Sequence, residues 1–151
     1  YATLYNYFKD IRDLIFCCIE DFMDECHNFV LEQKTGISPG KEGLKATSQN
    51  YAKFFIQYPG IFKLLYEQND IASHASNFVK IDQFFKSLTD PDWNLLSQQH
   101  KSTASMEARE IHNLAIHGLL LFYLNQRKTF DFHKLMQEIN NLTDFALIGY
   151  E

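Results

Sequence analysis

Apolar residues recur along the chain at intervals of three and four, the spacing of amphipathic helices. In the first such segment they run from Ile11 to Val30, which predicts one long helix over about residues 10–34. Asp10 is a suitable N-cap for this helix. Thr35-Gly36 is typical of a helix end, because glycine readily takes the left-handed conformation that closes the last turn.

Proline marks the next boundaries. Ser38-Pro39 is a cap followed by proline at the first helical position, so the pattern predicts a second helix over about 39–57. Tyr58-Pro59 ends that helix, because the residue before a proline avoids helical geometry. Pro59 then opens a short third helix that ends near residue 68.

The next segment carries the same cap-plus-proline signature in its middle. We expect a fourth helix over about 71–87, and a separate short helix that begins at Asp90-Pro91. The polar stretch 97–105 is predicted to be a loop or a frayed join.

Two further helices are predicted over about 104–126 and 130–148. The first of them is apolar on more than one side, so more than one side must be buried. Glycine and proline are scarce, at 6 and 3 among 151 residues, and this scarcity indicates a helical chain. The sequence therefore predicts an all-α fold of six to seven helices in a single domain.

Composition narrows the choice of environment and partner. The hydrophobic fraction of 46%, with 14 Phe and 8 Tyr, favours a packed globule, and no segment is apolar enough to cross a membrane. A net charge of −5 without a basic stripe argues against nucleic-acid binding by these residues alone. Three cysteines without CxxC spacing indicate a reducing compartment, so we expect a cytoplasmic protein.

The opening stretch TLYNYFKDIRDLI resembles the end of the DNA-binding region in the TetR family of bacterial regulators. In that family an aromatic run closes the recognition helix, and a turn then leads into a long connecting helix. The residues that fit this pattern are Thr3, Leu4, Tyr5, Tyr7, Phe8, Asp13 and Leu14, while Ile11 stands where the family has a lysine. YAKFFIQYPGIFKLLYEQ also looks like a helix–proline–helix step of the family.

The resemblance implies a division of the chain into two parts. Residues 1–9 would be the remnant of the recognition helix, and residues 10–151 the effector-binding and dimerisation domain. Roughly 35–45 preceding residues would carry the rest of the helix-turn-helix and its basic charge, and operator DNA would bind through them. Hydroxyl and cationic groups at the end of a recognition helix suit phosphate oxygens, so the predicted DNA contacts are Thr3, Tyr5, Tyr7 and Arg12.

The resemblance also implies a homodimer built from the last two helices. On the first of these helices, small residues would permit close approach of a partner helix, and the second would complete a two-fold four-helix interface. The predicted interface residues are Ile111, Ala115, Gly118, Phe122, Leu135, Ile139, Leu142 and Ala146.

A small hydrophobic or aromatic effector is the second partner that the resemblance implies. The predicted pocket residues are Phe22, Phe55, Phe62, Tyr66, Phe78, Asn113 and His117. Two readings stay open for them: the rings could line a cavity or simply form the core. The polar group of Glu110, Asn113 and His117, which share one helix face, could serve a ligand or form an internal network.

The pattern offers little support for catalysis or for a metal. His112 and His117 lie about 140° apart around a helix, so one ion cannot bind both. No nucleophile elbow, phosphate loop or glycine fingerprint is present in the sequence, so we expect no cofactor and no enzymatic activity. The sequence therefore predicts the effector-sensing and dimerisation part of a ligand-responsive transcriptional regulator, most simply a repressor. The alternative is a helical carrier of apolar ligands, or a protein-interaction module, with no DNA role.

Overall fold

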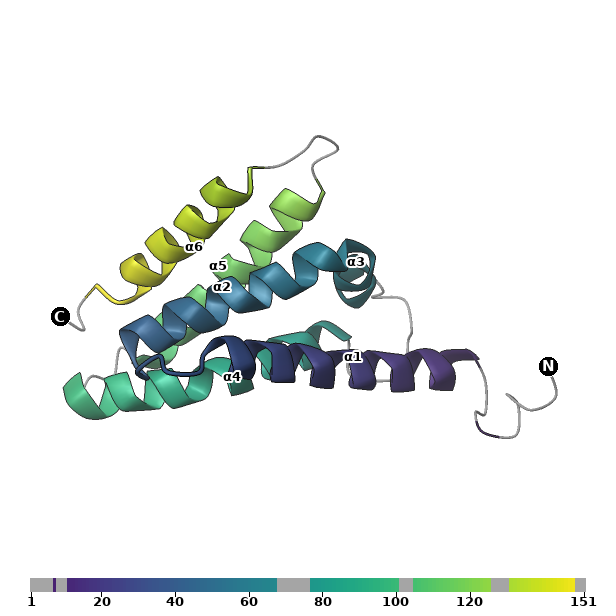
Figure 1. Ribbon diagram of the computed structural model, residues 1–151, viewed down its shortest axis with the longest axis horizontal. Helices are drawn as coiled ribbons and strands as arrows, with labels where there is room; N and C mark the ends of the chain where they lie inside the picture. The colour runs from purple at the N-terminus through teal and green to yellow at the C-terminus, as the bar shows by residue number, and fades with distance from the viewer. Residues whose placement is uncertain (1–6, 8–10, 68–76, 101–104, 126–130, 149–151) are drawn as a thin grey trace.

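A computed structural model describes residues 7, 11–67, 77–100, 105–125 and 131–148, which form helices and their connecting turns (Figure 1). The all-α prediction is confirmed. The helices are α1 (Ile11–Gln33), α2 (Lys41–Gln57), α3 (Pro59–Glu67), α4 (Asn77–His100), α5 (Ser105–Leu124) and α6 (Phe132–Ala146).

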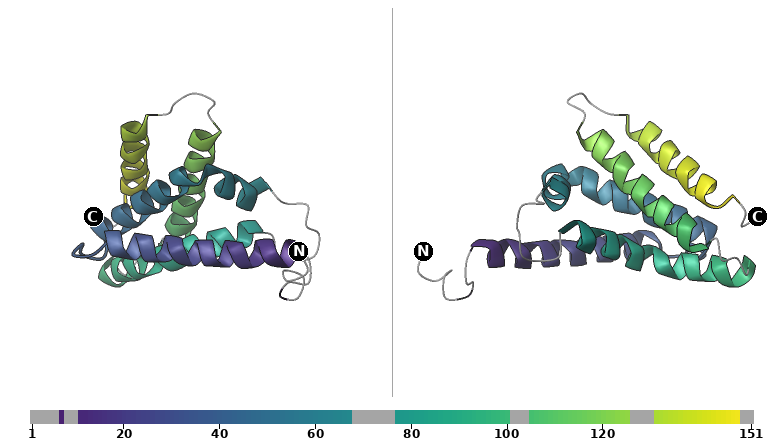
Figure 2. Two further views of the ribbon diagram at one scale, coloured as in Figure 1. Left: turned by 45° about the vertical axis from the view of Figure 1, so that its right-hand side comes forward. Right: turned by 180° about the vertical axis from the view of Figure 1, so that it is seen from behind.

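Helix α2 is the centre of the arrangement, since it packs against each of the other five described helices. In Figures 1 and 2, α1 and α4 lie on one side of α2, and the antiparallel pair α5–α6 lies on the other. The first turns of α1 extend beyond the body of the molecule in both figures. The described buried residues of α1 begin at Ile19.

Helix α1 forms and ends as its sequence predicts. Among the α1 residues whose burial the structure describes, Ile19, Phe22, Cys26 and Val30 are buried, and they recur at helical spacing. Gly36 has a φ of 82°, and the turn before it closes through a hydrogen bond from the Ile37 amide to the Lys34 carbonyl. The left-handed glycine thus turns the chain back toward α2.

The start of α2 was predicted wrongly, because Ser38-Pro39 lies outside the helix. Gly40 is the N-cap residue, with a φ of 101°, and no side chain caps the first turn. The amide of Gly40 instead donates to the Asp92 carboxylate of α4. A tertiary contact therefore replaces the local cap that the sequence favoured.

The prediction of two helices around Pro91 was also wrong, since α4 continues through this residue. Proline has no amide to donate to the Ser87 carbonyl, which would normally be bonded in a continuous helix. Ser87 and Pro91 are both exposed, so water can satisfy that carbonyl and the cost of the interruption is small. By contrast, Pro59 does open α3, as predicted.

The last two helices lie close to their predicted bounds. Asp131 caps α6, because its side chain accepts a hydrogen bond of 3.1 Å from the Lys134 amide. The polar stretch 97–105 was expected to be a loop, but α4 extends to His100 within it.

The main core is built around aromatic rings of α1 and α2. Phe22 of α1 lies 4.9 Å from Phe54 and 5.8 Å from Phe55 of α2, measured between ring centroids. Tyr51 packs at 4.8 Å on Phe55 and at 4.5 Å on Phe85 of α4. Tilted pairs at these separations are favourable beyond the area that they bury. A smaller cluster of Leu44, Trp93, Leu96 and Leu147 joins α2, α4 and the end of α6.

The buried carboxylate of Asp92 holds together the end of α1, the turn before α2 and α2 itself. Asp92 of α4 is fully buried, and its Oδ2 lies 2.7 Å from Lys34 Nζ at the end of α1. Its Oδ1 accepts from the Gly40 amide at 3.0 Å, and the Thr47 hydroxyl of α2 lies 3.4 Å from Oδ2. Gly43 packs directly on this carboxylate, leaving no room for a Cβ atom.

We therefore expect Gly43→Ala to destabilise the protein by about 2 kcal/mol or more, because the added methyl group would displace Asp92 from its partners. Gly60→Ala is the matched control, since nothing lies within 4 Å of the corresponding position in α3. Alanine favours helix, so this control should leave stability unchanged or raise it by up to about 1 kcal/mol. Urea denaturation measures both; equal effects of the two variants would contradict the packing of Gly43 on Asp92.

Candidate functional site

Two histidines of α5 place polar atoms inside the aromatic core. His117 Nε2 lies 3.0 Å from the Tyr51 hydroxyl, and both residues are buried. The His117 ring also packs against Phe85, with ring centroids 5.2 Å apart, and against Phe62 at 6.3 Å. The arrangement is a hydrogen-bonded polar pair surrounded by rings.

His112 belongs to a second buried network, between α2 and α6. The hydroxyls of Ser48 and Thr143 each donate to the carbonyl four residues earlier, at 2.9 Å. Because each hydroxyl gives its one proton to a carbonyl, we assign the imidazole proton to Nε2. Nε2 then donates to Thr143 Oγ1 at 3.1 Å, with Ser48 Oγ a second acceptor at 3.4 Å. Ser48 is therefore held as a structural hydroxyl and lacks the geometry of an activated nucleophile.

Burial keeps both imidazoles neutral. It lowers the pKa of His112 to about 4, an effect that the neighbouring Asn113 side chain partly opposes. Burial lowers the pKa of His117 to about 3, and the nearby charges of His112 and Lys86 act in the same direction. The centre of the molecule is thus polar but uncharged near pH 7.

Asn113, which precedes His117 by one turn on the same side of α5, is fully buried. Within the described part of the chain, neither its Nδ2 nor its Oδ1 makes a hydrogen bond. Its amide lies close enough to His112 to influence the pKa of that imidazole, without the geometry of a hydrogen bond. Buried amide groups are normally bonded, so this residue stands out among the polar residues of the core.

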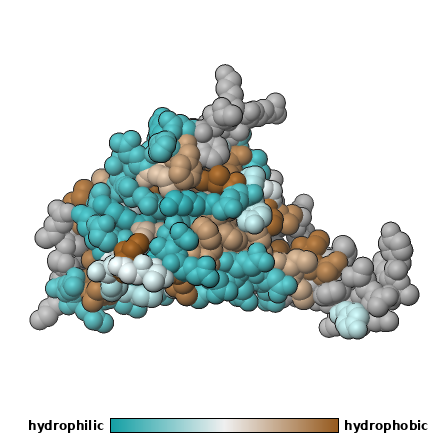
Figure 3. Space-filling model, viewed as in Figure 1, coloured by the Kyte–Doolittle hydropathy of each residue, from teal (hydrophilic) through white to brown (hydrophobic). Residues whose placement is uncertain are grey.

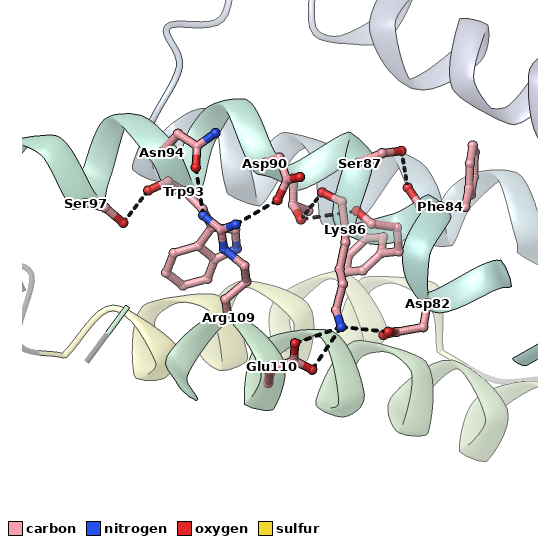
Figure 4. Close-up of polar contacts among 12 residues, drawn as sticks. Asp82, Phe84, Lys86, Ser87, Asp90, Trp93, Asn94, Ser97, Arg109 and Glu110 are labelled. Atoms are coloured by element: carbon pink, nitrogen blue, oxygen red, sulfur yellow. Dashed lines mark hydrogen bonds and ion pairs between the residues drawn. The ribbon is translucent and has the colours of Figure 1, made fainter. Parts of the chain in front are cut away.

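Charged residues line the solvent edge of the contact between α4 and α5 (Figure 4). Lys86 Nζ lies 2.8 Å from Asp82 Oδ2 and 2.7 Å from Glu110 Oε1, and these hydrogen bonds raise the pKa of Lys86 above its ordinary value. Further along the edge, Arg109 donates to Asp90 at 2.8 Å and to Asn94 at 3.1 Å. Ion pairs this accessible contribute at most about 1 kcal/mol each, so they fasten the edge only lightly.

The predicted pocket residues are only partly brought together. Phe22, Phe55, Phe62, Asn113 and His117 are buried in the core. The side chains of Tyr66 and Phe78 lie outside the described residues. Phe22 lies near Phe55, Phe55 packs on Phe62 at 4.8 Å, and Phe62 lies near His117. Four of the predicted residues therefore form one continuous cluster with Tyr51. Glu110, expected on the same face as Asn113, points to the solvent edge and pairs with Lys86.

The outer face of α5 carries an exposed apolar stripe. Ile111 and Phe122 are 58% and 64% exposed, and the exposed Gly118 lies between them. These three residues of the predicted interface are therefore accessible to a second molecule. Nothing lies within 4 Å of the position that a Cβ atom would take at Gly118. Exposed apolar stripes of this kind are typical of surfaces that contact another molecule.

The predicted contribution of α6 to this face needs correction. Leu135 and Ile139 are fully buried in the core of their own chain, so they cannot contact a second copy. Ala115, Leu142 and Ala146 are half-buried. The residue of α6 that sequence reasoning missed is Phe145, which is 69% exposed.

An open groove between α5 and α6 continues the exposed stripe. Its lining residues are Leu119, Glu138, Asn141, Leu142 and Phe145. Leu119 follows Ala115 by one helical turn on the same side of α5, so groove and stripe form one surface. We call this surface, made of the stripe and the groove, the outer α5–α6 face. The view in Figure 3 shows a surface that is mostly hydrophilic, with apolar patches, in the region of α1 and α2.

The predicted DNA contacts remain predictions. Thr3 and Tyr5 lie outside the described residues, as does the side chain of Arg12. Tyr7 is described and is exposed. Among the described residues, no group of three His, Cys, Asp or Glu side chains is placed to hold a metal ion. None of the described helices has the length and apolar character needed to cross a membrane.

Comparison of the chain with protein-family models, with curated proteins and with solved structures finds no match. The interpretation of its function therefore depends on its own residues and on their arrangement.

The two buried imidazoles make stability depend on pH in a defined direction. Their folded pKa values of about 4 and 3 lie below the ordinary value of 6.5. Stability is therefore fully present above pH 6.5 and is lost as pH falls toward 4, by about 1.4 kcal/mol per pH unit for each histidine. His112→Gln should halve this slope in urea denaturation, and an unchanged slope would contradict neutral burial. Hydrogen bonds from Lys45 and Lys41 lower the pKa of Asp144, so this carboxylate titrates below the pH range in which the two histidines change stability.

If two copies associate through the outer α5–α6 face, Gly118→Trp should convert the dimer into a monomer. The position is open in the single chain, so the indole would obstruct a partner without disturbing the fold. Gly60→Trp, at another glycine with nothing near its Cβ position, is the control and should leave the dimer intact. Sedimentation velocity measures both variants; a dimer that survives Gly118→Trp would exclude this face as the interface.

Proposed function

We propose that this chain is the effector-sensing and dimerisation part of a TetR-like, ligand-responsive regulator of transcription that acts as a repressor in the cytoplasm. The observation that carries the proposal is the outer α5–α6 face. Its exposed residues, Ile111, Phe122 and Phe145 among them, lie on the two helices that the resemblance assigns to dimerisation. An isologous contact between two copies would bury this apolar surface in a four-helix arrangement.

The form of α1 supports the same proposal. The helix has 23 residues, about 35 Å at 1.5 Å per residue, and its described buried residues begin at Ile19. Its far end is fixed by the ion pair of Lys34 with Asp92. A small rotation about the fixed end therefore gives a larger displacement at Ile11, where the DNA-binding segment would be attached.

The proposed mechanism is a shift between two orientations of α1 in the dimer. An effector that binds one orientation more tightly would change the separation of the two DNA-binding segments, and with it the affinity for an operator. A difference of about 1–3 kcal/mol between the two states is sufficient for a useful switch.

The experiment that tests the proposal uses the intact gene product, including whatever precedes Tyr1. Its binding to fluorescent DNA from its own upstream region is measured by anisotropy at several salt concentrations. We expect tight binding that weakens steeply with salt, and loss of binding for the chain that begins at Tyr1. Absence of binding by the intact product at low salt, without added ligand, would contradict the regulator and favour the helical carrier or interaction module.

A further inference from the structure

The buried amide of Asn113 is the least satisfied polar group that the structure describes in the core. The side chain is fully buried on α5, and neither amide atom makes a hydrogen bond within the described residues. Other buried polar side chains are bonded: Ser48, Thr47 and Thr143 each donate to a backbone carbonyl at 2.9 Å. A buried amide without partners destabilises the folded chain, so its retention calls for an explanation.

The region one turn along α5 from Asn113 has the composition of a site for a small apolar molecule. One turn along α5, His117 is hydrogen-bonded to Tyr51, and rings of Phe62 and Phe85 surround the pair. Most of this region is aromatic, with a few polar groups on one side. That combination is typical of small-molecule sites, in which apolar walls give affinity and a few polar groups fix the orientation.

The first half of α4 is the element best placed to move away from this region. Pro91 removes one backbone hydrogen bond from the helix. Two residues earlier, the Thr89 hydroxyl donates to the carbonyls of Phe85 and Lys86, and such bonds bend helices. Beyond Pro91 the helix is held by the directional bonds of the buried Asp92. Before Pro91 it is held by the accessible pairs of Lys86 and by the apolar contacts of Ile81, Phe85 and Leu88, which a movement of this half would have to open. Pro91 is thus a natural hinge between a fixed and a movable half.

We propose that Asn113 anchors a small, neutral ligand that carries a hydrogen-bond donor and acceptor side by side on a flat apolar body, as in a carboxamide or lactam. The first half of α4 would swing about Pro91 to admit it. An amide side chain offers one acceptor and two donors, so a ligand amide can satisfy it in a paired arrangement. A charged ligand is disfavoured, because burying an ion without a partner is costly and the charged groups of this edge, Asp82, Glu110 and Lys86, are already paired with one another.

The inference rests on the proposed function in so far as it names the class of effector, but its test needs no DNA. Three probes of similar shape differ in their polar group: benzamide has a donor and an acceptor, acetophenone an acceptor only, and isopropylbenzene neither. Binding to the chain is followed by the fluorescence of Trp93, which is the single tryptophan, is buried, and lies two residues beyond Pro91.

We expect the wild-type chain to bind benzamide at least tenfold more tightly than isopropylbenzene, with acetophenone between them. Asn113→Leu should reverse this order, and should also raise the urea concentration at the unfolding midpoint, because an unpartnered amide is replaced by an apolar group of similar size. Asn140→Leu is the matched control. Asn140 accepts a hydrogen bond of 2.8 Å from Gln49, so this variant should lower the midpoint and keep the wild-type order of probes.

Three results would overturn the inference: no saturable binding of benzamide to the wild-type chain up to its solubility limit, a preference for isopropylbenzene in the wild type, or a lowered midpoint in Asn113→Leu. The first two concern the wild-type chain and do not depend on how well a variant folds. A chain that binds benzamide as expected while the intact product fails to bind DNA would keep this site and remove the regulator. The opposite pair of results would keep the regulator and remove the site.

Discussion

The carboxylate of Asp92 joins parts of the chain that are far apart in sequence. It is fully buried on α4, pairs with Lys34 at the end of α1 at 2.7 Å, and accepts from the Gly40 amide at 3.0 Å. A buried carboxylate is tolerated only when charge and hydrogen bonds compensate its lost hydration. Because the partners come from α1, from the turn before α2 and from α2 itself, that requirement fixes where these segments meet. The close approach of Gly43 leaves little freedom to adjust.

Helices α1 and α4 are each held differently at their two ends. Helix α1 is anchored at its last turn and extends beyond the body at its first (Figure 1). Helix α4 is anchored by Asp92 just beyond Pro91, and its earlier half is held by the packing of Ile81, Phe85 and Leu88 and by ion pairs at an accessible edge (Figure 4). A rotation of α1 about its Lys34 end would displace chiefly its first turns, which precede the buried Ile19. The proposed regulatory role depends on such a change. Two copies joined through the outer α5–α6 face would convert it into a change in the separation of their DNA-binding segments.

Local signals in the sequence predicted well where most helices lie, but predicted poorly which distant residues contact them. The left-handed Gly36 and the start of α3 at Pro59 follow from backbone preferences, which operate within a few residues. The start of α2 at Gly40 depends on Asp92, 52 residues away, and no local pattern reveals it. Pro91 reads equally well as a helix start or as an exposed residue within a helix, because only its tertiary environment distinguishes the two.

The candidate site shows the same limit. The apolar pattern of α6 led us to predict Leu135 at the interface and to miss Phe145, because only packing against α5 and α2 decides that Leu135 is buried while Phe145 is exposed. Asn113 and His117 could be selected as unusual polar residues within an apolar helix, because burial of polar groups is visible in a sequence pattern. His112 was considered only as a metal ligand, whereas its partners Ser48 and Thr143 belong to two other helices.

Hydrogen exchange of Asp92→Asn against the wild type, followed by mass spectrometry, tests most directly whether one anchored end organises the molecule. The account predicts faster exchange of backbone amides at the end of α1, in residues 34–47 and in α4 beyond Pro91, with α5 and α6 little changed. Unchanged exchange around Asp92, or an equal increase across all six helices, would contradict the claim that this buried carboxylate holds one end of the molecule while the other is free to move.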